Sequence, residues 1–572
     1  MTRVHRLGLA LAFCGPAAFL GACEAYGLPA DDAVFRAMHD ELGRTMRRLR
    51  LGELSRPYFV SYTVRAATRA VVSADFGGIT RKSSWSDRIV SAAVRVGDYR
   101  LDQSNFISRS RGDCRPVVED GALEGEYDAI RFALWQATDR AYKQALECYS
   151  AKKAYMEKRE APHEADDFSR EGPHEFLEPE APETVDLDSW ERRIAVLSGI
   201  FREFPKIQSS LVSFEARPRT VRYVDSEGSV FRQSASIWSL EVRAKAQARD
   251  GMELSQNLEY LGRSEGELPD FEFVAEKTRG LATVMTAWVQ ASTMGAYVGP
   301  VLFEDQAAGE FFAHLFADQV SFLRVPWEED EQRSLFAGGA LSERLGMRVT
   351  APALSIRDDP TMARYGRLPL FGRYRVDSEG VPASRLRLVE RGKLLDVPMG
   401  RGPLPKRALS NGHGRSTPYS PPVGRIGNLI IEADSAVSRS DLKERLRALC
   451  REQGLEFGLR VLNFPTIQPS VGTTLPDPGW VYKVYAADGR EELVRGLQFA
   501  GTGVRALKDI VAVSSDVYVH NYYQPGPYRE NMDFVPASIV APSILVQEVE
   551  LKPIRTKPPK PPALPHPYFE RP

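Results

Sequence analysis

The chain has few cysteines, five in 572 residues. Cys114, Cys148 and Cys450 lie downstream of the N-terminal segment, far apart and without CxxC spacing. This spacing argues against a zinc cluster built from thiolates. It leaves open whether Cys114 and Cys148 form a disulfide, and an odd count leaves at least one free thiol in an oxidising compartment. A chain of this length is expected to fold around a large core without a disulfide framework.

The sequence also lacks an excess of charge of either sign. It has 75 Lys and Arg against 76 Asp and Glu, a net charge of -1. Nothing in this balance favours binding to nucleic acid or to acidic membranes. With 43% hydrophobic and 26% charged residues, the composition is typical of a soluble globular protein. The length allows two or more domains.

Long apolar runs are missing beyond the N-terminus. Two arginines precede an apolar run at 7–20, which a Gly-Pro pair interrupts. The run is too short and broken for a membrane span and is typical of a signal peptide at 1–22. Residues 20–23, Leu-Gly-Ala-Cys, resemble a bacterial lipobox with Cys23 as the acylated first residue. An ordinary signal peptide is the alternative. We expect an exported protein of the periplasm or cell envelope, attached to a membrane only through a lipid at Cys23.

Several enzyme signatures are absent. The sequence contains no Gly-x-Ser-x-Gly elbow, no P-loop and no dinucleotide fingerprint. The tetrapeptide Asp-Ser-Glu-Gly occurs twice, at 225–228 and 377–380. Asp at the start and Gly at the end are typical of a turn, and Ser226 and Ser378 have no His nearby in the sequence. Both copies are therefore interpreted as turns.

Periodic patterns predict the elements of the first half. An apolar stripe near period 3.6 predicts a helix over 31–51, and a longer helix is expected over 127–158. Between them, three strand-like runs at 58–64, 70–76 and 89–96 predict an antiparallel meander.

The following residues form a connection and two more helices. Residues 160–188 are acidic and contain prolines, so they are predicted to be an exposed connection. Asp188 and Ser189 are expected to cap a helix that runs to Phe204. Another helix is predicted over 270–292.

The pattern changes near residue 295, where short strands and Gly-rich turns begin to dominate. One amphipathic helix is predicted over 439–453 and one hairpin near Asp488-Gly489. We predict an α+β fold with an N-terminal α/β domain over 30–295, which holds an antiparallel sheet and long helices. A β-rich C-terminal domain covers 296–551, and the Pro-rich tail at 552–572 is expected to be extended or disordered.

A Glu and a His four residues apart suggest metal-dependent hydrolysis. Glu310 and His314 share one face of a predicted helix, as activation of a metal-bound water requires. The usual zinc motif has a His directly before the Glu, but here that residue is Gly309. Asp318 extends the stripe by one more turn. The stripe is interpreted as a solvated face, with a substrate-contacting remnant and a rebuilt metal site as alternatives.

A glycine-bracketed loop supplies a second group of candidates, Asn411, His413 and Arg415. Glycine lets backbone approach a ligand closely, and Arg can bind a carboxylate in a bidentate manner. We predict that these residues bind substrate, although a loop held only for its conformation explains them equally well. If a metal site had been rebuilt, Glu310, His314 and His413 would form it.

Many short segments resemble the TldD/PmbA family, the modulator-of-gyrase-like metallopeptidases. Their order and spread over roughly 30–550 place the chain in a longer, exported branch of that family. The segments that carry the resemblance are Val-Arg-Val-Gly-Asp-Tyr at 94–99, Leu-Trp-Gln-Ala-Thr-Asp-Arg-Ala-Tyr-Lys at 134–143, Asp-Phe-Ser at 167–169, Gln-Ala at 247–248, Asp-Gly at 250–251, Gly-Pro-Val-Leu-Phe at 299–303, Asp-Ser-Glu-Gly-Val at 377–381, Ser-Asn-Gly-His-Gly-Arg at 410–415, Asp-Gly-Arg-Glu at 488–491 and Ala-Pro-Ser at 541–543.

The resemblance implies an N-terminal α/β domain, a β-rich C-terminal domain and dimers that enclose a chamber. In the catalytic subunits of the family a helix supplies His-Glu-x-x-x-His, and a Cys from the C-terminal domain completes the zinc site. Glu310 matches the motif Glu and would be catalytic, and His314 matches the second His. Gly309 takes the place of the first His, and no Cys stands in a matching C-terminal segment. Cys450 falls within a predicted helix and is a poor substitute.

The resemblance and the missing ligands together predict an exported homologue with a degenerate zinc site. It would bind or handle peptides or unfolded polypeptides without cleaving them, as a homodimer or a heterodimer with a family paralogue. No cofactor is expected in that case, and zinc only if the protein is active. The alternatives are an active metallopeptidase with a non-standard metal site and a structural protein of the cell envelope.

Overall fold

The computed structural model describes most of the chain between residues 32 and 555. Cys23 and Cys114 lie outside the described residues. Within the described part, no helix has both the length and the apolar composition needed to cross a bilayer. The described ranges are 32–108, 116–123, 127–159, 164–181, 184–321, 324–329, 336, 339–341, 344–465, 474–527 and 534–555, with a few positions of the tail.

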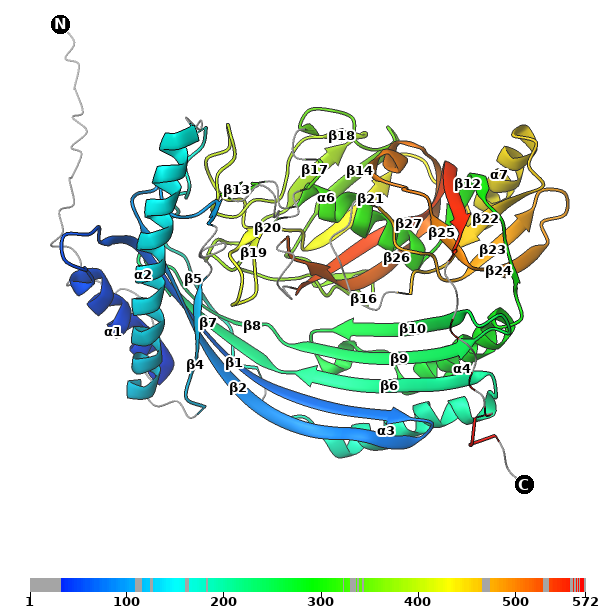
Figure 1. The fold of residues 1–572 in the computed structure, drawn as a ribbon, viewed down its shortest axis with the longest axis horizontal. Coiled ribbons are helices and arrows are strands. Elements are labelled where there is room, and N and C mark those ends of the chain that lie inside the picture. The colour runs from blue at the N-terminus through cyan, green and yellow to red at the C-terminus, as the bar shows by residue number, and fades with distance from the viewer. Residues whose placement is uncertain are drawn as a thin grey trace, which may run out of the picture.

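The first half of the chain forms a nine-stranded, strongly curved sheet (Figure 1). Most neighbours in it are antiparallel. The strand order is β10 (Glu253–Gly262), β9 (Ile237–Gln247), β6 (Ile207–Arg217), β1 (Pro57–Asp75), β7 (Arg219–Asp225), β8 (Val230–Ser234) and β5 (Glu175–Leu177), with β2 (Gly78–Val96) on β1 and β4 (Val117–Asp120) on β2.

Strands β1 and β2 form one long hairpin. The prediction of separate strands at 58–64 and 70–76 is wrong, because β1 continues through the half-buried residues between them. Its pairing with β2 on one side, and with β7 and then β6 on the other, satisfies the backbone over almost the whole length. The hairpin turns at Phe76 and Gly77, whose φ values are 43° and 79°. Glycine adopts this left-handed conformation without strain.

Four helices cover this sheet, and three of them begin close to where the sequence predicts. Helices α1 (Ala33–Arg48) and α2 (Tyr127–Arg159) pack on it near one end, while α4 (Phe271–Trp288) lies near the other (Figure 1). Helix α3 (Leu187–Gly199) begins earlier than predicted. Its cap is Asp186, whose Oδ1 accepts from the Ser189 N–H at 3.0 Å.

The cysteines divide between these helices and the second half. Cys148, in α2, is disulfide-bonded. Its partner lies outside the described residues, because Cys450, the other cysteine within them, is free and buried.

The second half forms a mixed twelve-stranded sheet, so the predicted α+β class is confirmed. The sequence predicted short strands in this half, but two of its strands are long. Strands β26 (Ile510–Pro525) and β27 (Phe534–Pro553) pair over most of their length. The order is β11 (Ser292–Thr293), β24 (Glu491–Arg495), β23 (Val481–Tyr485), β22 (Phe457–Val461), β12 (Tyr297–Phe303), β27, β21 (Asn428–Ala433), β14 (Leu354–Asp358), β17 (Leu386–Glu390) and β18 (Lys393–Leu394), with β25 (Leu497–Phe499) and β26 on β27.

Smaller elements complete this half. Helix α7 (Arg439–Glu452) and the β23–β24 hairpin at Asp488-Gly489 form as predicted. Two short ladders in this half are β15 (Arg364–Tyr365) with β16 (Leu368–Pro369) and β19 (Gly414–Arg415) with β20 (Val423–Gly424). A further ladder, β3 (Phe106–Ile107) with β13 (Trp327–Glu328), joins the two halves.

One buried helical segment lies at the centre of the second half. It runs through α5 (Gln306–Phe312), a π-helical turn (Ala313–Ala317) and α6 (Asp318–Val320). It packs against β26 and β27 inside the largest hydrophobic cluster. π-Helical turns inside α-helices are frequent at functional sites.

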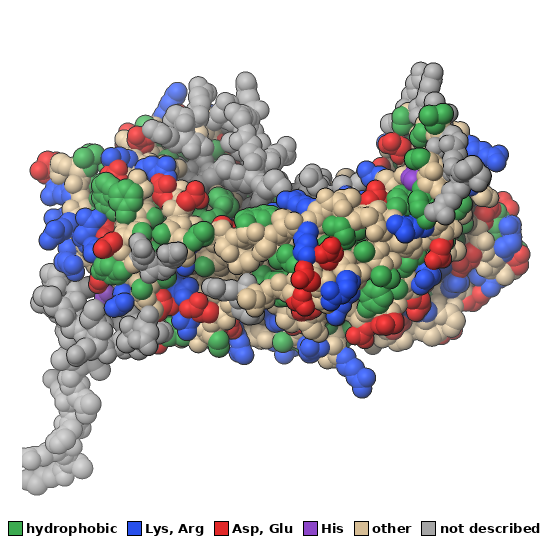
Figure 2. All heavy atoms as spheres, turned by 90° about the horizontal axis from the view of Figure 1, so that it is seen from below, with side chains coloured by type: hydrophobic (Ala, Val, Ile, Leu, Met, Phe, Trp, Pro, Cys, Tyr) green, Lys and Arg blue, Asp and Glu red, His purple; other side chains and the backbone are tan. Residues whose placement is uncertain are grey.

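The two sheets lie one above the other, and β26 of the second contacts β10 of the first (Figure 1). On the face seen from below, acidic and basic side chains are intermixed with apolar patches (Figure 2). This mixture agrees with the balanced charge of the sequence.

Candidate functional site

The helix that carries Glu310 and His314 is buried, so the interpretation of its polar stripe as a solvated face is wrong. Glu310 is 4% exposed and Asp318 is 2% exposed. The helix has no solvent face because it lies between β26, β27 and the loops of the second half. An amphipathic pattern does not reveal this kind of burial, since the polar face is covered by other polar side chains.

His520, on β26, fills the space that a side chain at Gly309 would need. A Cβ at position 309 would lie 2.5 Å from the Cβ of His520 and 2.9 Å from its Cγ. Carbon atoms do not pack this closely, so any larger residue would have to displace the strand or the imidazole. The absence of a side chain at Gly309 therefore leaves room for the imidazole of His520 against the helix. The sequence prediction missed His520.

Both imidazoles contact the Glu310 carboxylate. The Nε2 of His314 lies 3.3 Å from Oε2, and the Nε2 of His520 lies 3.2 Å from Oε1. Burial opposes ionisation of Glu310, but the two imidazoles outweigh it and hold the pKa of this carboxyl well below its usual range. Burial likewise opposes charge on His314, but its contact with Glu310 raises the pKa of the imidazole.

A second carboxyl lies on the far side of His314. The Oδ2 of Asp318 is 3.9 Å from its Nδ1, and Oδ1 of Asp318 accepts from the Gln524 amide at 3.3 Å. Burial raises the pKa of Asp318 to about 7. The ring of Tyr522 stacks on His520 with centroids 5.2 Å apart. The cluster is thus enclosed by polar and aromatic groups of α6 and β26.

The cluster extends towards the space between the two sheets. Tyr518, on β26, is 38% exposed, and Glu259, on β10, also keeps contact with solvent. The protein atoms around Glu259 still raise the pKa of its carboxyl to about 7, and the charge of Glu241 adds to this effect. Tyr518 of the second sheet and Glu259 of the first sheet are therefore both located between the two sheets.

These residues do not fit a hydrolytic zinc ion. Such a site usually has three protein ligands and one open position. Among the described residues, no three His, Cys, Asp or Glu side chains come together as a metal site. His314 and His520 each face a different oxygen of Glu310. Cys450 lies in an apolar cluster of α7, where burial raises the pKa of its thiol to about 11.

The loop residues Asn411, His413 and Arg415 make internal contacts. His413 is fully buried, with Nδ1 2.9 Å from the Asn411 carbonyl oxygen and Nε2 3.1 Å from the Asp358 Oδ2. Arg415 donates to the carbonyl oxygens of Ile426 and Pro536. None of these contacts joins the loop to Glu310 or His314. Arg415 does line a cavity between the sheets.

The two Asp-Ser-Glu-Gly copies form turns, as predicted, and they also meet. Asp225 Oδ1 accepts the Glu227 N–H at 2.9 Å, and Asp377 Oδ1 accepts the Glu379 N–H at 2.9 Å. Arg401 joins the copies, because its guanidinium contacts Glu227 at 2.6 Å and its backbone N–H donates to the Glu379 carboxylate at 2.6 Å. The turns therefore connect the two halves of the chain.

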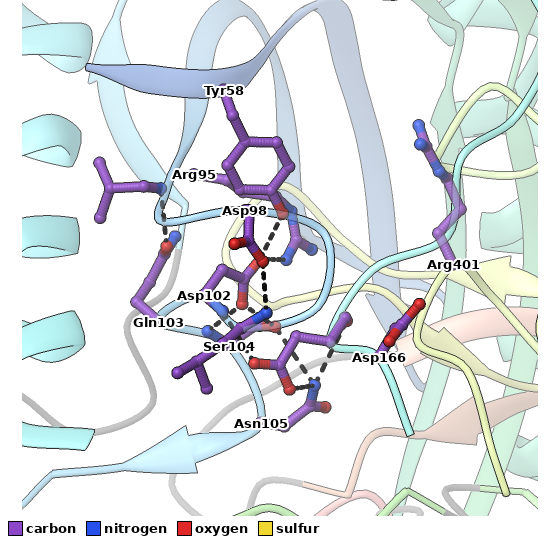
Figure 3. A network of polar contacts seen from close by, with 12 residues as sticks. Tyr58, Arg95, Asp98, Asp102, Gln103, Ser104, Asn105, Asp166 and Arg401 are labelled. Carbon is purple, nitrogen blue, oxygen red and sulfur yellow. Dashed lines mark hydrogen bonds and ion pairs between the residues drawn. The ribbon is translucent and has the colours of Figure 1, made fainter. Parts of the chain in front are cut away.

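A polar network lies beside this junction (Figure 3). Tyr58 and Arg95 each contact Oδ2 of Asp102 at 2.7 Å, and the buried Lys152 contacts Asp167 at 2.5 Å. The prediction of an exposed connection over 160–188 is wrong at Asp167, which is 2% exposed. Burial of this charge is tolerated because Lys152 and Arg324 both pair with it.

Comparisons with known proteins agree with this fold. Residues 295–552 match the sequence model of the PmbA/TldA metallopeptidase C-terminal domain. A protein of Archaeoglobus fulgidus named metalloprotease is 26% identical over 353 residues, which cover 59% of this chain and 72% of that protein. A metalloprotease of Synechocystis sp. is 27% identical over 237 residues, 40% of this chain and 46% of the relative.

Two solved structures have a similar fold. TldE from Thermococcus kodakarensis superposes with a TM-score of 0.56 at 14% identity, and 90% of this chain covers 99% of that chain. A putative modulator of DNA gyrase from Thermotoga maritima gives a TM-score of 0.55 at 15% identity. The superposition covers 86% of this chain and 96% of that chain. The sequence relatives, the matching C-terminal domain and the shared fold lead to one conclusion. The chain belongs to the TldD/PmbA family.

Proposed function

We propose that this protein binds peptides or unfolded polypeptides without hydrolysing them. The observation that carries the proposal is the replacement at Gly309. An imidazole from β26 occupies the space of the missing side chain and pairs with Glu310. In this proposal, Glu310 contacts two imidazoles of the protein itself and does not activate a metal-bound water.

The state of Glu310 supports the absence of hydrolysis. A general base works best when its pKa lies near the working pH. The imidazoles of His314 and His520 hold the pKa of Glu310 far below neutrality, so its carboxylate is a weak proton acceptor. It is also engaged on both oxygens. The remaining groups of the cluster do not supply three metal ligands within the described residues.

A peptide is the ligand that the family membership favours. The relatives that share sequence with the chain are named metalloproteases. The space between the sheets presents hydroxyl, guanidinium and aromatic groups from both halves, which suits an extended polar ligand. We further propose that the protein acts as a homodimer or as a heterodimer with a family paralogue.

Export is part of the proposal. The disulfide at Cys148 supports folding in an oxidising compartment. The lipobox at 20–23 supports anchoring through Cys23 after removal of residues 1–22. Wild-type protein should fractionate with membranes, whereas Cys23→Ser should abolish lipid labelling. Unlabelled wild-type protein in the soluble periplasmic fraction would contradict the anchor.

The decisive experiment measures binding, cleavage and zinc content on the mature protein. We expect binding of an unfolded peptide library, no products by mass spectrometry, and no loss of binding after chelation. Glu310→Gln serves as the control for residual catalysis and should leave the product profile unchanged. Cleavage by the wild type that Glu310→Gln and a chelator both abolish would show an active metallopeptidase instead.

A further inference from the structure

An arginine-lined cavity separates the two sheets, apart from the Glu310 cluster. Its volume is 440 Å³. One wall is the face of the first sheet formed by β1, β7 and β8, and the other consists of loops from the second half. Volumes of this size are typical of small-ligand pockets. Six arginines line it: Arg65, Arg219, Arg263, Arg373, Arg375 and Arg415.

Only two of these arginines are neutralised by carboxylates of the described chain. Arg65 pairs with Asp87 at 2.9 Å, and Arg373 pairs with Glu267 at 2.8 Å. The other four form no ion pair within the described residues. Three of them donate only to backbone carbonyl oxygens, and the side chain of Arg375 is exposed.

The two acidic side chains that line the cavity are already engaged. Asp377 accepts three backbone N–H groups, from Glu379, Val381 and Gly414. Glu178 accepts the N–H of Ser234 at 2.9 Å. Neither forms an ion pair with a cavity arginine. The cavity therefore carries an excess of positive charge.

This excess is costly unless an anion offsets it. Burial lowers the pKa of Arg219 to about 10 and that of Arg263 to about 9, and neighbouring guanidiniums add to both shifts. Both side chains are half-buried. A partly desolvated charge without a partner is unfavourable, and a charge-assisted hydrogen bond to an anion relieves it. Guanidinium groups match the planar geometry of a carboxylate.

The rest of the lining suits the same ligand. Ser61, Thr63 and Ser416 also line the cavity, and a hydroxyl group can donate a hydrogen bond to an anion. The rings of Tyr223 and Tyr374 provide apolar walls. Guanidinium, hydroxyl and aromatic groups together fit the end of a peptide better than a bare inorganic ion.

We propose that this cavity binds a carboxylate group of a peptide, with Arg219, Arg263 and Arg375 as its partners. The inference rests on the proposed function in one respect, that the carboxylate is carried by a peptide. The carboxylate is either the C-terminus or an acidic side chain, which share one chemistry. This site would select among the peptides that the protein binds.

Isothermal titration with matched peptides tests the site. A short peptide with a free C-terminus should bind about tenfold or more tightly than its C-terminal amide. An amidated peptide that ends in Glu, compared with one that ends in Gln, shows whether a side-chain carboxylate is accepted. Arg219→Gln and Arg263→Gln should remove the preference for the acid while keeping the affinity for the amide. Arg385→Gln, an exposed arginine outside the cavity, is the control.

The outcomes separate the two proposals. Equal binding of all acid and amide forms would overturn the carboxylate site and leave peptide binding intact. If no peptide binds, the proposed function fails, and thermal shifts with succinate then decide about the cavity. Stabilisation by succinate that Arg219→Gln abolishes would support a carboxylate site of another source, and no stabilisation would overturn it. Arg375→Gln gives a second variant if a buried substitution prevents folding.

Discussion

Two regions of this protein bury charge in opposite ways. In the cluster on the central helix, one carboxylate lies between two imidazoles, so Glu310 finds its partners within the fold. In the cavity between the sheets, Arg219, Arg263 and Arg415 are crowded together without a carboxylate partner among the described residues. A buried charge that the fold pairs internally makes the fold sensitive to loss of its partner, whereas a charge left without a partner favours binding of a ligand. Ligand recognition is therefore proposed for the cavity and not for the Glu310 cluster.

Replacing Glu310 should give the largest effect. Glu310→Gln removes the charge that both imidazoles face, and breaking a buried pair costs about 3–5 kcal/mol of unfolding free energy. Because the imidazoles hold the pKa of Glu310 below its ordinary value of 4.5, its contribution is complete above that pH and is lost as the pH falls further. The contact also raises the pKa of His314 above its ordinary value of 6.5, so the contribution of a charged imidazole is complete below that pH and is lost at higher pH. Urea denaturation of wild type and variant should therefore differ most between these two ordinary values and converge in acid.

An exposed carboxylate is the matched control for this prediction. Glu444 pairs with Arg447 and Arg451 on the surface of α7. Solvent screens such pairs, so Glu444→Gln should leave the stability nearly unchanged at every pH. If Glu310→Gln has no larger effect than Glu444→Gln, the imidazoles do not stabilise the fold through Glu310.

A smaller loss is expected from filling the space at Gly309. Gly309→Ala gains about 1 kcal/mol of helix propensity, but its Cβ would meet His520 at 2.5 Å. Overpacking typically costs about 1–3 kcal/mol, so the net effect should be a loss of stability. A double-mutant cycle with His520→Ala should show that the loss depends on the imidazole. A simple gain of stability in Gly309→Ala would contradict this packing.

The smallest change is expected in the cavity. Arg219→Gln removes a guanidinium that forms no ion pair with any residue of the described ranges. Relief of repulsion should offset the lost hydrogen bond to the Ala235 carbonyl oxygen and keep the stability within about 0.5 kcal/mol of the wild type. Arg65→Gln, in the same cavity, breaks the pair with Asp87 and should cost more. The melting temperatures of both variants test this order, and Arg65→Gln should have the lower one. A larger loss from Arg219→Gln would show that its charge is compensated by the protein.

The sequence by itself determined the elements whose signals are local. The stripes that predict α1, α2 and α7 repeat every few residues, and a helix needs only neighbours in the chain to express such a pattern. The missing first His at Gly309 and the family were likewise visible in the sequence. The continuity of β1 was not, because its pairing partners hold the strand together where its own pattern weakens.

Only the tertiary structure decided what surrounds these elements. His520 reaches Gly309 because β26 pairs with β27 and packs against α5, and no periodic signal links residues so far apart in the chain. The burial of Glu310 and the gathering of Arg219, Arg263 and Arg375 arise in the same way. A local pattern specifies which face of an element is apolar. It does not specify which polar groups long-range packing brings against the other face.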